Sequence, residues 1–117
     1  MRLLALAVAL MSAFAIAGLA IGQEFRPLAG RYALTTSNMV DSIPGEKPDR
    51  VIVFVEGKAA EDIFKGMAQK PTKDRCASDI VSKMAGNLVC SKLDAGKFFC
   101  SFGVSLHDGR ILNGRTC

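Results

Sequence analysis

The sequence predicts a two-layer α+β sandwich in which one main helix packs on a mainly antiparallel sheet of about four to six strands, stabilised by disulfides. Three observations indicate this class: an unbroken apolar run at residues 51–55, an amphipathic segment at 58–69, and strand-like segments between Gly- and Asp-rich turns from residue 79 onward. All three lie within residues 23–117, which we expect to form a single small domain.

The 22 residues at the start of the chain differ in composition from the rest. Eighteen of them are hydrophobic and Arg2 is their only charged residue, which leaves 14 basic and 11 acidic residues and a net charge of +3 in residues 23–117. A basic start, an apolar stretch and a small-residue end are typical of a secretory signal peptide. We expect residues 1–22 to be cleaved after Ala20 or Gly22, giving a periplasmic or secreted product. The alternative is an N-terminal membrane anchor, which is disfavoured because no basic cluster follows the apolar stretch.

The first predicted elements are two strands separated by a loop. Residues 30–36 contain Tyr32 and Leu34 in alternation, which favours a strand. Residues 41–50 hold two prolines, a glycine and several charged side chains, so we expect an exposed loop. The five apolar residues at 51–55 predict a central strand that is buried on both faces.

An amphipathic helix is predicted over residues 58–69, ended by Pro71. Its apolar face is expected to cover the sheet and carries Ala60, Ile63, Phe64 and Met67. Gly66 costs about 1 kcal/mol relative to alanine within a helix, so we expect this small residue to allow a close approach of the helix to the sheet.

The second half of the chain predicts four strands, at residues 80–84, 87–93, 98–106 and from 111 to the end. Alternate residues of the third of these strands share one face, which is the predicted core: Phe98, Cys100, Phe102, Val104 and Leu106.

Turn chemistry predicts the register of these strands. A three-residue loop with Gly96 in the left-handed conformation sets Leu93 opposite Lys97, and therefore Cys90 opposite Cys100. A two-residue Asp108-Gly109 turn sets Leu106 opposite Ile111, and therefore Cys100 opposite Cys117 as well. Cys90 and Cys117 thus compete for one sulfur.

Four cysteines in a short exported chain predict two disulfides. We favour the pairs Cys90–Cys100 and Cys76–Cys117, and the alternative is Cys100–Cys117 with Cys76–Cys90. A zinc site is disfavoured because no two cysteines are closely spaced and His107 is the only histidine. We expect no metal and no cofactor.

No catalytic constellation is evident, and we expect no enzymatic activity. His107 beside Asp108 and near Ser101 and Ser105 suggests a general base with a serine nucleophile. The favoured interpretation is a turn whose residues serve backbone geometry. Nucleic-acid binding is disfavoured by the low net charge and the export signal.

Two regions are candidate partner contacts. Phe99 and Val89 point away from the core, where residues 30–36 either cover them as a second layer or leave them exposed to a partner. The loop at 41–50 offers Lys47 and Arg50, since loops on a rigid scaffold often carry recognition.

The leading functional hypothesis is a small exported binding module without catalysis, an inhibitor or accessory protein of the cell envelope. Its partner would be a protein or envelope component, with no nucleic acid and no stable membrane span after signal cleavage. One alternative is a basic, surface-associated structural envelope protein that uses residues 65–75. A further alternative is a small hydrolase that uses His107.

Overall fold

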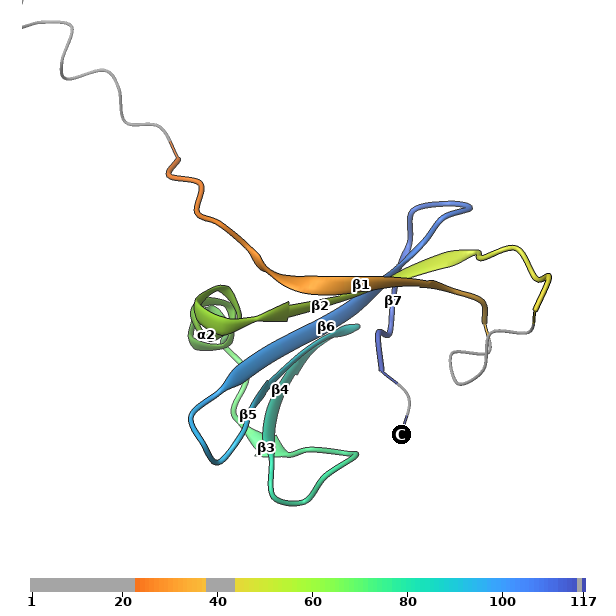
Figure 1. The fold of residues 1–117 in the computed structure, drawn as a ribbon. Coiled ribbons are helices and arrows are strands. Elements are labelled where there is room, and N and C mark those ends of the chain that lie inside the picture. Colours follow the sequence, from red (N-terminus) through yellow and green to blue (C-terminus); the bar gives the residue numbers. More distant parts are fainter. Residues whose placement is uncertain (1–22, 38–43, 116) are drawn as a thin grey trace, which may run out of the picture.

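A computed structural model of the chain describes residues 23–37, 44–115 and 117. The expected signal peptide and its cleavage lie outside the described residues. Within the described part, one helix packs on one face of an antiparallel sheet, and two disulfides are present. Figure 1 shows the helix at one end of the sheet. The α+β class is therefore confirmed.

The elements follow one another along the chain. The described part of the chain contains, in order, β1 (Ala29–Thr35), β2 (Arg50–Glu56), α2 (Gly57–Gly66), β3 (Thr72–Lys73), β4 (Val81–Ala85), β5 (Leu88–Lys92), β6 (Phe98–Ser105) and β7 (Ile111–Leu112). The seven strands exceed the expected number because β3, a two-residue strand, has no alternating pattern that predicts it.

The strand order is β1-β2-β6-β5-β4-β3, and β7 also pairs with β6. All pairs are antiparallel. β6 is the centre of the sheet, because β2 pairs along one edge while β5 and β7 pair with successive parts of the chain along the other. Its eight residues are long enough to hold all three neighbours.

β2 is an interior strand, as its apolar run predicts. Ile52 is 5% exposed and Val55 is 4% exposed, and their odd spacing places them on opposite faces of the sheet. We call the face that α2 covers the helix face, and it carries Val55. The other is the opposite face, and it carries Ile52.

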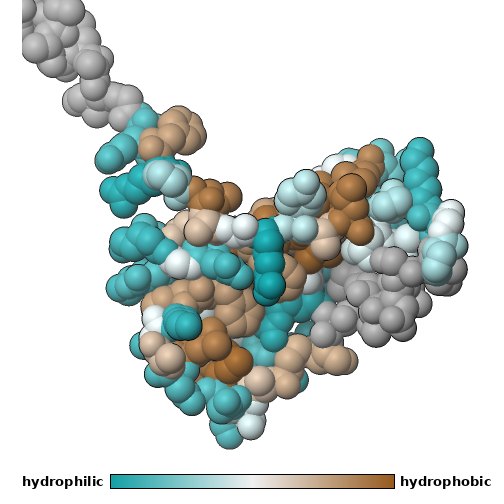
Figure 2. All heavy atoms as spheres, in the orientation of Figure 1, coloured by the Kyte–Doolittle hydropathy of each residue, from teal (hydrophilic) through white to brown (hydrophobic). Residues whose placement is uncertain are grey.

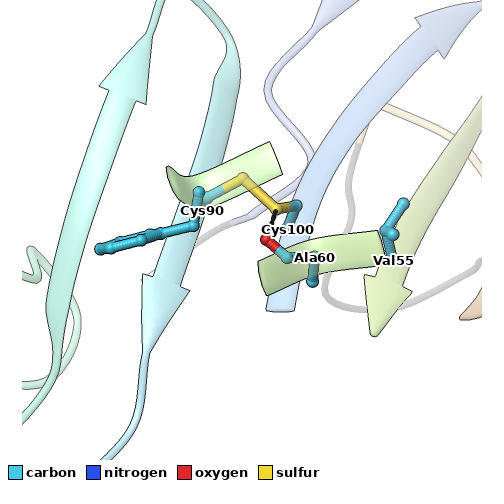
Figure 3. Close-up of a cluster of buried hydrophobic side chains, with 5 residues drawn as sticks. Val55, Ala60, Cys90 and Cys100 are labelled. Atoms are coloured by element: carbon cyan, nitrogen blue, oxygen red, sulfur yellow. Dashed lines mark hydrogen bonds between the residues drawn. A yellow bond between two sulfur atoms is a disulfide. The ribbon is translucent and has the colours of Figure 1, made fainter. Parts of the chain in front are cut away.

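The helix face holds the hydrophobic core, in which Val55, Ala60, Phe64, Cys90 and Cys100 are buried. Figure 3 shows the disulfide of this core, which joins β5 to β6. The Cys100 sulfur lies 3.6 Å from the main-chain oxygen of Ala60 in α2. The expected helix stripe and strand face therefore meet.

α2 is shorter than expected, since it ends at Gly66 instead of Gln69. Its end is fixed by Lys83 on β4, whose Nζ donates hydrogen bonds to the main-chain oxygens of Phe64 at 2.9 Å and Met67 at 3.1 Å. The expectation for Gly66 is wrong, because a Cβ atom added there would meet no other atom within 4 Å. Gly66 therefore does not mediate a close approach to the sheet.

The β5–β6 turn has the predicted geometry. Gly96 has φ +73°, the Leu93 amide donates to the Lys97 carbonyl oxygen at 2.9 Å, and Cys90 lies directly opposite Cys100. These two cysteines are joined in a disulfide, and the second disulfide joins Cys76 to Cys117. This is the pairing that we favour from the sequence.

The predicted register of the β6–β7 turn is wrong. Ile111 pairs with Val104 instead of Leu106, because the loop is closed between Ser105 and Arg110 by a backbone hydrogen bond of 2.8 Å. The Ser105 hydroxyl accepts bonds from two loop amides, which stabilises the longer loop. The predicted alignment of Cys117 with Cys100 depended on the shorter turn.

Candidate functional site

A groove of about 860 Å³ lies at the end of the sheet where β2 passes directly into α2. Gly57 has φ +65°, a left-handed conformation that glycine adopts without strain, so the chain turns from strand to helix without a loop. The loop between β5 and β6 forms the other side. The groove is lined by Arg31, Phe54, Glu56, Gly57, Lys58, Glu61, Leu93, Gly96, Lys97, Phe98 and Phe99.

Three half-buried phenylalanines form the apolar part of this groove. Phe98 lies on the helix face, where its ring centroid is 5.3 Å from that of Phe64 in the core. Phe54 and Phe99 lie on the opposite face, since the residues across from them are Ser101 and Glu56 respectively. The groove therefore wraps around the end of the sheet and reaches aromatic rings on both faces.

Arginine side chains hold the two rings of the opposite face in place. The Arg31 guanidinium lies 5.4 Å from the Phe54 ring centroid, and the Arg115 guanidinium lies 5.4 Å from the Phe99 ring centroid. Cation–π contacts of this kind favour a fixed ring orientation. Two of the three rings that line the groove are thus in contact with an arginine of the same chain.

The rim of the groove carries charges of both signs. Arg31 lies 3.5 Å from Glu56, and the exposed Lys97 stands on the loop across from them. Glu61 accepts a hydrogen bond from Lys65 at 2.7 Å, and this contact lowers the pKa of Glu61. The rim therefore offers both acidic and basic contacts.

A second, smaller cavity of about 270 Å³ lies beside a buried polar cluster on the opposite face. Asp74 accepts a bidentate pair of hydrogen bonds from Arg115, at 2.9 and 3.0 Å, and also accepts from Ser82. The Ser82 hydroxyl is 2.6 Å from that of Ser91. Because Arg115 is fully engaged by Asp74, this cluster fastens the last described residues to the sheet and is not an open anion site.

Of the predicted contact residues Phe99 and Val89, only Phe99 lies in the groove. Phe99 lines the groove, whereas Val89 is only 6% exposed and is not available to a partner. The expectation that residues 30–36 cover these side chains is wrong, because that segment forms the edge strand β1. Arg115 lies over Phe99 instead, and Val89 lines the smaller cavity beside it.

Lys47 and Arg50 are not brought together with Phe99. Arg50 begins β2, while the groove lies at the other end of that strand, at Glu56. Arg50 pairs with Asp49 at 3.0 Å, and Lys47 is exposed. Part of their loop, residues 38–43, lies outside the described residues.

His107 is an exposed loop residue. The nearby Ser105 hydroxyl accepts hydrogen bonds from the His107 and Asp108 amides, and Asp108 is bonded to Arg110 at 2.7 Å. Ser101 is fully buried. These contacts all stabilise the loop, and none of them joins the imidazole to a serine hydroxyl.

The basic run at residues 65–75 does not form one patch. Lys65 pairs with Glu61, and Lys83, further along the chain, is directed at the end of α2. Asp74 is buried in the middle of the sequence run. Lys70, Lys73 and Arg75 remain exposed.

Phe54, Arg31 and Arg115 are groove or supporting residues that the sequence does not single out. Phe54 is one of five consecutive apolar residues, so the run itself does not distinguish it from its neighbours. Arg31 contacts the Phe54 ring from β1, and Arg115 contacts the Phe99 ring from the segment after β7. The alternation of β2 is the one signal that separates Phe54 from Val53 and Val55.

Among residues 23–37, 44–115 and 117, no group of three His, Cys, Asp or Glu side chains is placed to hold a metal ion. In the same part of the chain, no helix has the length and apolar character needed to span a bilayer. Comparisons with protein families, curated proteins and solved structures found no match to this chain.

Proposed function

We propose that the protein is an exported, disulfide-stabilised binding module without catalysis, and that the groove at the end of the sheet receives an exposed segment of a protein partner. The observation that carries this proposal is the combination of three half-buried phenylalanines with a rim of both charge signs. Aromatic and arginine side chains account for much of the binding energy in protein interfaces.

The size and chemistry of the groove suit a peptide segment. Its volume of about 860 Å³ falls in the range of roughly 300–1,000 Å³ that is usual for ligand sites. An apolar side chain of the partner would lie against Phe99 and Phe54, while Arg31, Glu56 and Lys97 would pair with its polar groups. We assign such a groove to an inhibitor or accessory protein of the cell envelope, and two disulfides are compatible with an oxidising exported location.

The test begins with affinity capture from the envelope and medium of the producing cell, using the oxidised protein as bait. The captured protein is then titrated against the wild type, Phe99→Ala and a matched control, Phe25→Ala, whose ring is 90% exposed and does not line the groove. We expect Phe99→Ala to raise the Kd at least about tenfold, which is about 1.4 kcal/mol, and Phe25→Ala to leave it unchanged.

A second variant separates loss of binding from loss of folding. Lys97→Glu reverses one exposed rim charge without touching the core, so its fold is retained while its affinity changes. Equal affinity of all variants would contradict the groove as the binding site. Recovery of anionic polymer alone would favour the alternative of a surface-associated basic protein.

A further inference from the structure

β1 is an edge strand with a free side. It pairs with β2 along its whole length from Ala29 to Thr35, and no other described strand lies beside it. Residues 29–34 are all exposed. An edge of this length presents unpaired amides and carbonyls, which proteins usually protect with proline, a bulge or an inward-pointing charge. β1 has none of these on its helix face.

The helix face next to this edge is apolar; Val53 and Phe102 pack against the core under α2, while the side chains nearer the edge and towards β7 stay exposed. Leu34, Val51, Val104 and Ile111 lie in one row across four strands, and Tyr32, Val53 and Phe102 lie in the next row. Tyr32 is 74% exposed, Leu34 53% and Ile111 52%. Figure 2 shows hydrophobic surface along this part of the sheet, between α2 and the β6–β7 loop.

We propose that β1 pairs with β1 of a second copy of this chain, antiparallel and about a two-fold axis at Tyr32. An antiparallel pair related by a two-fold axis keeps the helix faces of both copies on the same side, so the two apolar faces become one continuous surface. With Tyr32 opposite its own counterpart, all seven residues of the strand find a partner.

The register centred on Tyr32 is self-complementary in shape. It sets the exposed Leu34 of one copy opposite Gly30 of the other, since both lie two positions from the centre. Gly30 has no side chain and, with Leu28, Tyr32 and Val53, lines a shallow depression of about 330 Å³. Leu34 of each copy therefore lies against the depression at Gly30 of the other, so this contact occurs twice across the axis.

The same register is compatible with the charges of the strand. Arg31 is the only charged residue of β1, and it would lie opposite the small Ala33 of the other copy. A register centred on Arg31 would place two arginines directly opposite each other, which is destabilising. The charge pattern thus disfavours the register centred on Arg31, and the Gly30–Leu34 fit favours the one centred on Tyr32.

The test is sedimentation velocity over a concentration series of the purified oxidised protein. We expect a reversible dimer in the wild type. Tyr32→Lys should raise the dimer Kd at least about tenfold, because it places two lysines opposite each other on the axis. Leu106→Lys is the control, since it adds a lysine at an exposed apolar side chain (53% exposed, against 74% for Tyr32) that follows β6 and is not part of the β1 edge, and it should leave the Kd unchanged.

Amide hydrogen exchange gives a second readout that does not depend on the variants. The β1 amides that point away from β2 should gain protection as the protein concentration rises. A wild type that stays monomeric at every concentration would overturn the proposal, as would a dimer that Tyr32→Lys leaves intact. A monomer whose β1 becomes protected only by another protein would assign the edge to a different partner.

Discussion

Asp74 is a buried carboxylate whose bonds reach across the molecule. Its side chain is 2% exposed, and it accepts hydrogen bonds from Arg115, Ser82 and the amides of Cys76 and Ala77. In the sequence this residue interrupts a basic run. Its main partner lies 41 residues further along the chain, beyond the reach of any local pattern. No sequence argument could therefore assign it a buried ion pair.

The bonds of Asp74 make stability dependent on pH. The Arg115 guanidinium, with the Ser82 hydroxyl and the Cys76 amide, holds the pKa of the Asp74 carboxyl well below its ordinary value, although burial alone would raise it. A folded-state pKa below the unfolded value of roughly 3.9 stabilises the fold above that pH. This contribution is lost as the pH falls below about 4.

We expect the free energy of unfolding, measured with denaturant from pH 7 down to pH 2, to fall steeply in the acid range. Asp74→Asn should cost about 3–5 kcal/mol at neutral pH, because it leaves the half-buried Arg115 without its charge partner, and should flatten the acid limb. Asp108→Asn is the control, since that carboxylate pairs with Arg110 on an exposed loop. An unchanged acid limb in Asp74→Asn would exclude Asp74 as its origin.

At the scale of elements, local patterns predict α2 and the β5–β6 hairpin because both depend on residues close in sequence. Gly96 and the cysteine alignment follow from turn chemistry alone. The end of α2 does not, because Lys83 approaches it from β4. The β6–β7 turn differs from its predicted form because the Ser105 hydroxyl stabilises a longer loop than the Asp-Gly pair predicts.

Lys83→Met tests the helix end, because methionine keeps much of the apolar stem and removes the ammonium. The ammonium bonds two terminal carbonyls of α2 and lies 4.6 Å from the Phe64 ring centroid. We expect unfolding by urea to show a loss of about 1–3 kcal/mol. The control is Lys92→Met. The Lys92 ammonium is exposed and lies 5.9 Å from the Phe98 ring centroid, so its removal should cost less than about 1 kcal/mol, as for other surface contacts. Equal losses in both variants would contradict a capping role.

At the scale of the whole molecule, the two disulfides differ in their surroundings. Cys90 and Cys100 are fully buried in the core beneath α2, whereas Cys76 and Cys117 are exposed at the surface. The sequence places Cys100 on the predicted core face with Cys90 opposite it, so the burial of this pair under α2 follows from the strand pattern, whereas no local pattern predicts the exposure of Cys76 and Cys117. Access of a thiolate to the sulfur controls the rate of disulfide exchange.

Mild reductant under native conditions should therefore open Cys76–Cys117 first and leave Cys90–Cys100 closed. Alkylation of the freed thiols followed by peptide mass spectrometry measures the order. In denaturant, where burial no longer protects the core pair, both should open at comparable rates. Early labelling of Cys90 or Cys100 in the native protein would contradict this expectation.

The strand order also divides the folding of the chain into two parts. β4, β5 and β6 are joined by short turns as hairpins between neighbours in sequence, and such hairpins form in about 1–10 μs. The seam between β2 and β6 joins residues 43 to 55 positions apart, so it requires closure of a long loop. Until β6 arrives, one edge of the most apolar strand is unpaired. During that interval the chain is most exposed to incorrect strand pairing. The interval ends when β6 pairs with β2 and α2 packs against both strands.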